Sequence, residues 1–314
     1  CVCLPEDGRG DALTPGLLVD CSMALAPETI YQGFAAAPPL VPPPGAITRL
    51  VIMSSELTYM QEDSFANVSF SHIHIKYNHA LASLTPDALR SSESSLRVLD
   101  LRNNNLTEVV LPLAAFKELQ FLSLEANGLH EAAAVALMPS LLHLSLANNI
   151  LHHMPSHALT GLPELQFLDL HSNRLQVVPP QIANLHNLRS LLLAGNPITT
   201  LHAGMLSGLN NLEVLDVSET LVSVPESGSL ATPTSSPWLL NLRNTPLQKL
   251  PFKSFGTGIL PAWVDLRNTE VSDLMEEDFR PLLENMEVLN IIHTDWGQPQ
   301  IWASSDHLTN CNGK

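Results

Sequence analysis

Basic residues are scarce in this chain. Fifteen lysines and arginines stand against 31 aspartates and glutamates, which leaves a formal charge of −16 with the 13 histidines counted as neutral. A surface of this sign repels phosphate backbones and anionic lipid, so the composition argues against nucleic acid and the membrane surface as partners. Basic proteins and neutral ligands fit it better. No apolar run is long enough to span a bilayer, so we expect no membrane insertion.

Cysteine is also rare. Cys1, Cys3 and Cys21 crowd the start of the chain, and Cys311 stands near its end. In a cytosolic protein they would be free thiols or half of a metal site, whereas in an extracellular protein the first three would tie down a cap. Glycosylation sequons at Asn67 and Asn105 and a first residue other than methionine favour a secreted, processed glycoprotein. Any signal peptide or anchor would then lie outside this sequence.

Signatures of catalysis are absent from the sequence. There is no G-x-S-x-G motif and no phosphate-binding glycine pattern, and His130-Glu131 is followed by three alanines instead of completing H-E-x-x-H. The pairs His72/His74 and Asp169/His171 offer too few ligands for a metal ion, so we expect solvated side chains there. We therefore predict a non-enzymatic protein with no cofactor and no metal.

One repeated pattern dominates the chain. Between Leu165 and Leu175, four leucines and Asn173 follow L-x-x-L-x-L-x-x-N-x-L, the leucine-rich-repeat signature, and related segments recur every 22 to 26 residues. The central L-x-L alternates with a period of two, which predicts a short strand with its leucines pointing inward. Eleven such strands are predicted, with repeats beginning at Ile47, Phe70, Leu96, Leu119, Leu141, Leu165, Leu188, Leu212, Pro237, Pro261 and Met286.

These repeats predict an α/β leucine-rich-repeat solenoid, a curved horseshoe of about eleven repeats with a parallel sheet on its concave face. Residues 1–46 are assigned to an N-terminal disulfide cap and a proline-rich connector. Residues 47–296 form the repeat array, and residues 297–314 a C-terminal cap or tail.

A polar residue follows each predicted strand and is expected to bond backbone groups inside the stack. It is an asparagine in six repeats but a hydroxyl residue in the first repeat and in the last four, where one hydroxyl replaces an amide. We expect the C-terminal third to be held less tightly for this reason. The series runs Ser55, Asn78, Asn104, Asn127, Asn149, Asn173, Asn196, Thr220, Thr245, Thr269 and Thr294.

The residues between the inward leucines are candidates for binding a partner. Phe121, His143 and Phe167 should form an aromatic ridge on three adjacent strands, with Asp169 and His171 beside it; such a cluster is typical of a binding hot spot, unless a cap or loop covers it. Asp-Leu-Arg and Asn-Leu-Arg segments either form weak surface pairs that keep this face soluble or make a polar contact strip. The remaining candidate contact residues are Arg102, Glu125, Arg243 and Arg267.

The first third of the chain resembles a group of secreted arthropod proteins related to the non-catalytic subunit of Oplophorus luciferase. The resemblance rests on Cys-Val-Cys at the start, on Asp20-Cys21-Ser22, and on the runs 65–75 and 95–101. It implies a Cys1–Cys21 disulfide, with Cys3 pairing to a cysteine that this chain lacks. It further implies a secreted, non-enzymatic subunit that stabilises or carries another protein, such as a catalytic subunit.

The end of the chain departs from that group. The usual C-terminal cap with closely spaced cysteines is replaced by Trp296, Trp302 and the solitary Cys311. Cys311 is then free, bonded to residues beyond Lys314, or bonded to another chain, so a covalent or non-covalent oligomer remains open. The competing interpretation is the ectodomain of a receptor, adhesion or innate-immune recognition protein whose membrane anchor is absent from this chain.

Overall fold

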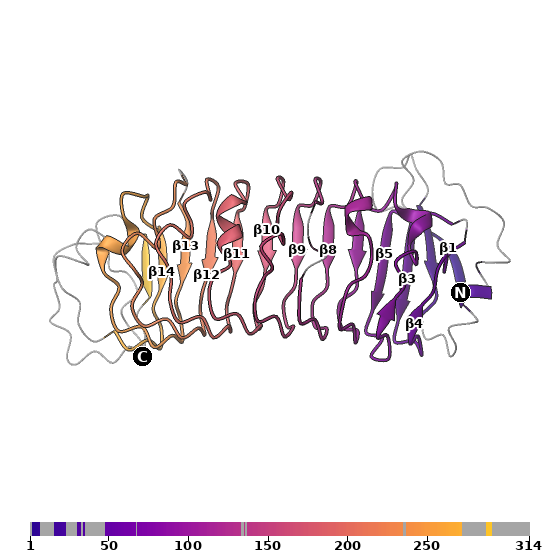
Figure 1. Ribbon diagram of the computed structural model, residues 1–314, viewed down its shortest axis with the longest axis horizontal. Coiled ribbons are helices and arrows are strands. Elements are labelled where there is room, and N and C mark those ends of the chain that lie inside the picture. The colour runs from indigo at the N-terminus through magenta and orange to yellow at the C-terminus, as the bar shows by residue number, and fades with distance from the viewer. Residues whose placement is uncertain are drawn as a thin grey trace. The chain divides into compact units, whose positions relative to one another are not determined.

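The computed structural model describes residues 2–6, 16–22, 30–32, 34, 48–66, 68–132, 135, 137–234, 237–271 and 287–290. The chain divides into two compact units, Cys1–Leu165 and Gln166–Lys314, each of which has its own run of strands (Figure 1). Among the described residues, no helix is both long and apolar enough to cross a membrane.

The first unit is organised around one sheet. Its strands follow the order β1 (Val2–Glu6), β2 (Gly16–Asp20), β3 (Thr48–Met53), β5 (His72–Lys76), β7 (Val98–Asp100), β8 (Phe121–Ser123) and β9 (His143–Ser145). Strands β1 and β2 are antiparallel, and every later pair in this unit is parallel. The short strands β4 (Tyr59–Met60) and β6 (Ser83–Leu84) pair separately, and the 3-10 helices η1 (Arg90–Ser92) and η2 (Leu113–Ala115) lie in the connections.

The second unit continues the same repeat. Its parallel strands are β10 (Phe167–Asp169), β11 (Ser190–Leu192), β12 (Val214–Asp216), β13 (Leu239–Asn241), β14 (Trp263–Asp265) and β15 (Val288–Asn290). The 3-10 helices η3 (Pro180–Asn184) and η4 (Phe252–Phe255) lie in its connections. Each predicted repeat strand coincides with an observed one, from β3 to β15, so the predicted leucine-rich-repeat solenoid is confirmed.

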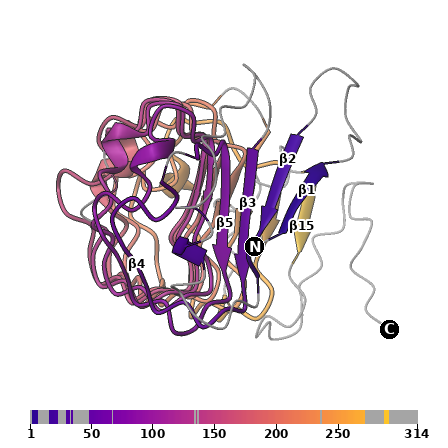
Figure 2. The ribbon, with the colours of Figure 1, turned by 90° about the vertical axis from the view of Figure 1, so that its right-hand side faces the viewer.

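The core lies between the sheet and the connecting turns. Figure 2 shows β2, β3 and β5 along one side of the chain, with the connections on the other side. Inward leucines at equivalent positions of neighbouring strands, such as Leu99, Leu122 and Leu144, are fully buried. Each contributes roughly 1.5–3 kcal/mol by leaving water. The repeated leucines are therefore structural and carry no specificity.

Phe34 of the N-terminal segment packs against aromatic rings of the first repeats. The rings of Phe34, Phe65 and Phe70 meet edge to face, with centroids 5.1 Å apart for Phe34–Phe65 and 5.6 Å for Phe65–Phe70. Cys21, at the end of β2, is 2% exposed and disulfide-bonded, and its backbone N–H donates to the Val51 carbonyl. Cys1 lies outside the described residues, so the Cys1–Cys21 pairing stays a prediction.

The asparagines that follow the strands form hydrogen bonds with backbone groups, as their position predicts. Asn149 Nδ2 donates to the carbonyls of Leu124 and Leu146 at 3.0 Å, and its Oδ1 accepts the N–H of Leu129 at 3.0 Å. It thereby joins two successive repeats. Thr245 Oγ1 instead donates to the Leu242 carbonyl of its own turn at 2.7 Å. Thr294 lies outside the described residues.

Candidate partner-binding surface

Side chains between the inward leucines line one side of the sheet, which we call the sheet face. In β8, Phe121 is half-buried on the sheet face and Leu122 is fully buried beneath it, while Ser123, the next residue on the sheet face, is also buried. Because parallel strands are in register, equivalent residues stand side by side, as His72 and Val98 do. A partner lying on this face therefore meets rows of side chains about 4.8 Å apart.

Two of the predicted aromatic residues are stacked on the sheet face. The rings of Phe121 and His143 lie 4.5 Å apart between centroids and are tilted by 13°. Such a pair is worth about 0.5–1.5 kcal/mol beyond the area it buries, which holds both rings in place before a partner arrives. Phe167 begins β10 and occupies the same position in the second unit, so the ridge of three residues remains a prediction.

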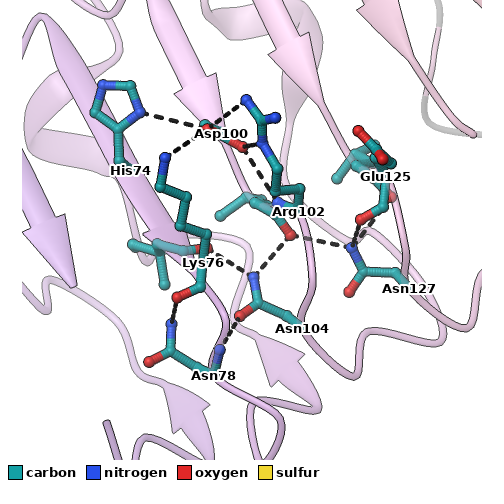
Figure 3. Close-up of polar contacts among 11 residues, drawn as sticks. His74, Lys76, Asn78, Asp100, Arg102, Asn104, Glu125 and Asn127 are labelled. Carbon is teal, nitrogen blue, oxygen red and sulfur yellow. Dashed lines mark hydrogen bonds and ion pairs between the residues drawn. The ribbon is translucent and has the colours of Figure 1, made fainter. Parts of the chain in front are cut away.

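A buried carboxylate organises the polar residues beside the aromatic pair (Figure 3). Asp100 is 1% exposed, and it accepts two hydrogen bonds from the guanidinium of Arg102, from Nε at 2.8 Å and from Nη2 at 3.0 Å. Lys76 Nζ and His74 Nδ1 lie 3.6 and 3.5 Å from the same carboxylate. Asp100 thus contacts three basic side chains at once.

The charge state of Asp100 follows from these contacts. Burial alone raises the pKa of its carboxyl, but hydrogen bonds from His74 and Arg102 and the charges of Arg102 and Lys76 outweigh burial and hold the pKa well below its usual range. The hydrogen bond to Asp100, opposed by burial and helped by the charges of Asp100 and Glu125, raises the pKa of Arg102. Asp100 is therefore ionised at any physiological pH.

The three Asp-Leu-Arg and Asn-Leu-Arg segments do not behave as a ladder of weak surface pairs. Asp265 is also 1% exposed, and Arg267 Nε reaches both of its oxygens at 2.9 Å, so β14 repeats the arrangement of β7. Asn241 differs: it accepts the backbone N–H of Arg243 at 3.1 Å and leaves that guanidinium exposed. In the two Asp-Leu-Arg segments, the two-residue spacing predicts that the aspartate and the arginine share one face. The burial of the aspartate, in contrast, depends on the residues packed around it.

Asp169 and His171 form a close pair at the end of β10. His171 Nδ1 lies 2.7 Å from Asp169 Oδ1, which also accepts the His171 backbone N–H at 3.0 Å. Within the part of the chain that the structure describes, no three His, Cys, Asp or Glu side chains converge in a way that could hold a metal ion. Glu125, the last of the predicted contact residues, follows β8 and is half-buried.

The structure also brings together a basic cluster that the sequence analysis did not predict. It consists of Arg49, His72, His74, Lys76 and Arg102, on the sheet face of β3, β5 and β7 or immediately beyond it. Burial, then the charges of Arg49, His74 and Arg97, lowers the pKa of His72 to about 4. The available signal was the recurrence of basic residues at outward positions of β3 and β5 and just after β7, which a chain-wide charge of −16 conceals.

The predicted modification and cysteine sites are only partly described. Asn105 is exposed in the turn after β7, where its backbone N–H donates to the Leu81 carbonyl. Cys3 lies on β1, of which only the backbone is described. Asn67, Cys1, Cys311, Trp296 and Trp302 fall outside the described residues.

Comparison with known proteins agrees with the repeat geometry. Residues 117–175 and 168–222 match one sequence model of the leucine rich repeat, and residues 95–115 match a second. Chaoptin of Drosophila melanogaster is 32% identical over 192 residues, covering 58% of this chain and 14% of chaoptin. Tsukushi of Mus musculus is 28% identical over 222 residues, covering 67% of this chain and 59% of tsukushi. This chain thus spans less than two thirds of either relative.

Solved structures show the same fold. A TLR13–ssRNA13 complex matches with a TM-score of 0.71 at 19% identity, covering 87% of this chain and 40% of that one. The Toll–Spatzle complex of Drosophila matches with a TM-score of 0.63 at 17% identity, covering 82% and 33%. The chain is a leucine-rich-repeat protein. More particularly, it is distantly similar to extracellular leucine-rich-repeat proteins, chaoptin and tsukushi among them.

Proposed function

We propose that this chain is an extracellular, non-enzymatic scaffold that binds another protein through its sheet face and serves as a non-catalytic or stabilising subunit of a complex. The observation that carries the proposal is the Phe121–His143 stack, two half-buried rings held parallel on the sheet face beside a charged network. Binding energy at protein interfaces concentrates in such aromatic and arginine anchors.

Rigidity of the polar residues supports the same role. Arg102 is held by two hydrogen bonds to Asp100, which is itself buried, so it loses little side-chain freedom when a partner docks. Arg267 is held in the same way by Asp265. Phe167, Asp169, His171, Glu125 and Arg243 complete the proposed contact residues.

Two similarities point in the same direction. The N-terminal third resembles secreted arthropod proteins related to a non-catalytic luciferase subunit, which fits a stabilising role. One matching structure holds a leucine-rich-repeat protein, Toll, in complex with Spatzle, so this fold can present a surface to a protein partner.

The test begins with purification of the chain from its native source and identification of the protein that co-elutes. With that partner in hand, the Phe121→Ser/Phe167→Ser variant should bind at least about 100-fold more weakly by calorimetry, because each hot-spot aromatic is worth roughly 2 kcal/mol or more. Its circular dichroism and thermal unfolding should match those of the unaltered chain, since neither ring is part of the leucine core.

Val110→Ser/Leu221→Ser is the matched control. Both residues are exposed apolar side chains, 40% and 53% accessible, and neither lies on a strand. This variant should keep full affinity. Undiminished binding by the Phe121/Phe167 variant, or an equal loss in the control, would contradict the proposed surface.

A receptor or adhesion ectodomain is the competing function. It shares the protein-binding surface but predicts a precursor with a membrane segment or lipid-anchor signal. Sequencing of the messenger RNA from the native tissue distinguishes the two functions. An encoded membrane segment or lipid-anchor signal would favour the receptor over the soluble subunit.

A further inference from the structure

A cavity of about 300 Å³ lies in the first unit, between the connections that follow β7 and β8 and away from the sheet face. Its floor is apolar and consists of side chains that are each at most 3% exposed: Leu124, Leu129, Ala132, Val135 and Leu146. Sites for small molecules are concave and mostly apolar with a few polar groups, and this volume is at the lower end of their range. The cavity therefore has the size and the lining of a site for a small ligand.

The sequence explains why space is left at this point. The position five residues after the asparagine that follows each strand holds Val109 in one repeat, Ala132 in the next and Met154 in the one after that. In the second unit the same position holds Val178 and Leu201. An alanine in place of these larger side chains leaves the volume of several methylene groups unfilled in an otherwise close-packed interior. Such a space costs stability, so an apolar occupant would be favoured.

The exposed rim of the cavity is acidic. Glu108 and Glu131 occupy equivalent positions of successive repeats, and both line the cavity. Within the part of the chain that the structure describes, neither carboxylate makes an ion pair. Thr107 and His130 also lie on the rim, and no lysine or arginine is among the described residues that line the cavity. Because the two carboxylates repel each other, a cation placed between them would be attracted to both.

We propose that this cavity binds a small amphiphilic amine, with its apolar body in the space beside Ala132 and its ammonium group between Glu108 and Glu131. At about 30 Å³ for each water-sized group, the cavity takes a ligand of roughly ten non-hydrogen atoms. The ammonium group stays at the exposed rim, so its charge is not buried. The site lies on the connections, and the inference is independent of the protein binding proposed for the sheet face.

Other occupants fit the cavity less well. An anion would be repelled by both carboxylates, and a neutral apolar molecule would fill the space but leave the charges of Glu108 and Glu131 unmatched. A lysine side chain of a protein partner carries the same ammonium group. Its thin, flexible stem would leave more of the cavity empty than a compact ring does.

Three small molecules of the same shape provide the test on the full chain. Phenethylamine is the probe, and phenethyl alcohol and phenylacetate are its neutral and anionic counterparts; binding of each is followed by ligand-observed NMR titration. Phenethylamine should bind about tenfold more tightly than phenethyl alcohol, because each exposed carboxylate adds a weak ion pair. Phenylacetate should bind more weakly than the alcohol.

Charge variants test the role of the rim. Glu108→Gln/Glu131→Gln should reduce the affinity for phenethylamine to that for phenethyl alcohol. Glu118→Gln/Glu164→Gln is the matched control, because it makes the same charge change at two exposed glutamates of the first unit that do not line the cavity. The control should preserve the preference for the amine.

Filling the cavity tests the role of its apolar floor. Ala132→Met introduces the residue that the next repeat has at the equivalent position, and it should abolish binding of both the amine and the alcohol. Its unfolding temperature should be at least that of the unaltered chain, because the added methylene groups replace empty space. If methionine overpacks the site and lowers that temperature, Ala132→Val, which matches Val109, makes the same test with a smaller side chain and should weaken binding of both ligands several-fold.

The proposal would be overturned by any of several results. The first is a failure of the chain to prefer the amine over the alcohol or over phenylacetate, including no binding of any of the three. Another is an equal loss of amine binding in the two glutamine double variants, which would show a general charge effect. Undiminished amine binding by the Ala132 variants would place the ligand elsewhere. Tighter binding of an acetylated lysine amide than of phenethylamine would assign the cavity to a protein side chain.

Discussion

At the scale of single residues, the sheet face owes its order to acids that are buried beside arginines. Asp100 is the last residue of β7, and Arg102 follows two positions later, where its side chain lies on the same side as that of Asp100. The planar guanidinium then closes over the carboxylate through two hydrogen bonds, and Asp265 and Arg267 repeat this contact. The result is a charged surface whose side chains are already fixed.

His72 should make the stability of the first unit depend on pH. Its pKa is about 4 in the folded chain, against 6.5 for the ordinary side chain, so acidification protonates it in the unfolded chain first. The free energy of unfolding should therefore fall as the pH drops from about 6.5 to about 4. His72→Asn should make this slope shallower, as measured by urea unfolding at several pH values across that window.

NMR titration of the His72 ring protons provides the direct check, with a midpoint near pH 4 expected. His79→Asn, which removes an exposed histidine from the same unit, controls for the loss of a histidine as such. A midpoint for His72 at its ordinary value would refute the assignment.

At the scale of structural elements, the residue after each strand decides how firmly consecutive repeats are joined. Asn104, Asn127, Asn149 and Asn196 each donate from Nδ2 to a carbonyl of the preceding repeat and to one of their own. Thr220, Thr245 and Thr269 donate within their own turn at 2.7–2.8 Å. A hydroxyl is too short, and has too few donors, to do both.

Asn149→Thr should therefore cost stability. It leaves the Leu124 carbonyl and the Leu129 N–H without their bonds to Asn149 in a buried position, which corresponds to a loss of about 2–3 kcal/mol. Chemical unfolding measures the loss, with Asn210→Thr, an exposed asparagine in the second unit, as the control.

Hydrogen exchange tests the same idea without mutation. Backbone amides around Asn149 should exchange more slowly than those around Thr245 and Thr269. Equal protection at the three positions would mean that the threonines join the repeats as well as the asparagines do.

At the scale of the whole molecule, charge and cysteine placement set the conditions for assembly. The acidic chain carries its basic cluster in the first unit, near an N-terminal segment in which Cys21 is disulfide-bonded. We predict that peptide mapping without reductant recovers Cys1 linked to Cys21. It should also show whether Cys311 is linked to another chain, as intact mass before and after reduction would confirm. A Cys3–Cys21 linkage would contradict the pairing that the resemblance implies.

The sequence was sufficient for the repeat fold because its determinants are local and repeated. Leucine spacing defines each strand, and the asparagine after it defines the turn, so the strand positions agree within two residues of the predicted repeat starts. The pairing of Phe121 with His143 was also predictable, because register follows from the repeat period.

Other properties of the candidate surface depended on tertiary structure. Asp-Leu-Arg and Asn-Leu-Arg look alike in sequence, yet Asp100 and Asp265 are buried, whereas Asn241 is only half-buried and its neighbour Arg243 is exposed. The neighbouring strands determine which outward side chains are covered. The basic cluster arises in the same way, from residues more than twenty positions apart that parallel pairing sets side by side. Short-range spacing thus determined the solenoid, whereas contact between repeats decided the charge and burial of the surface that we propose binds a partner.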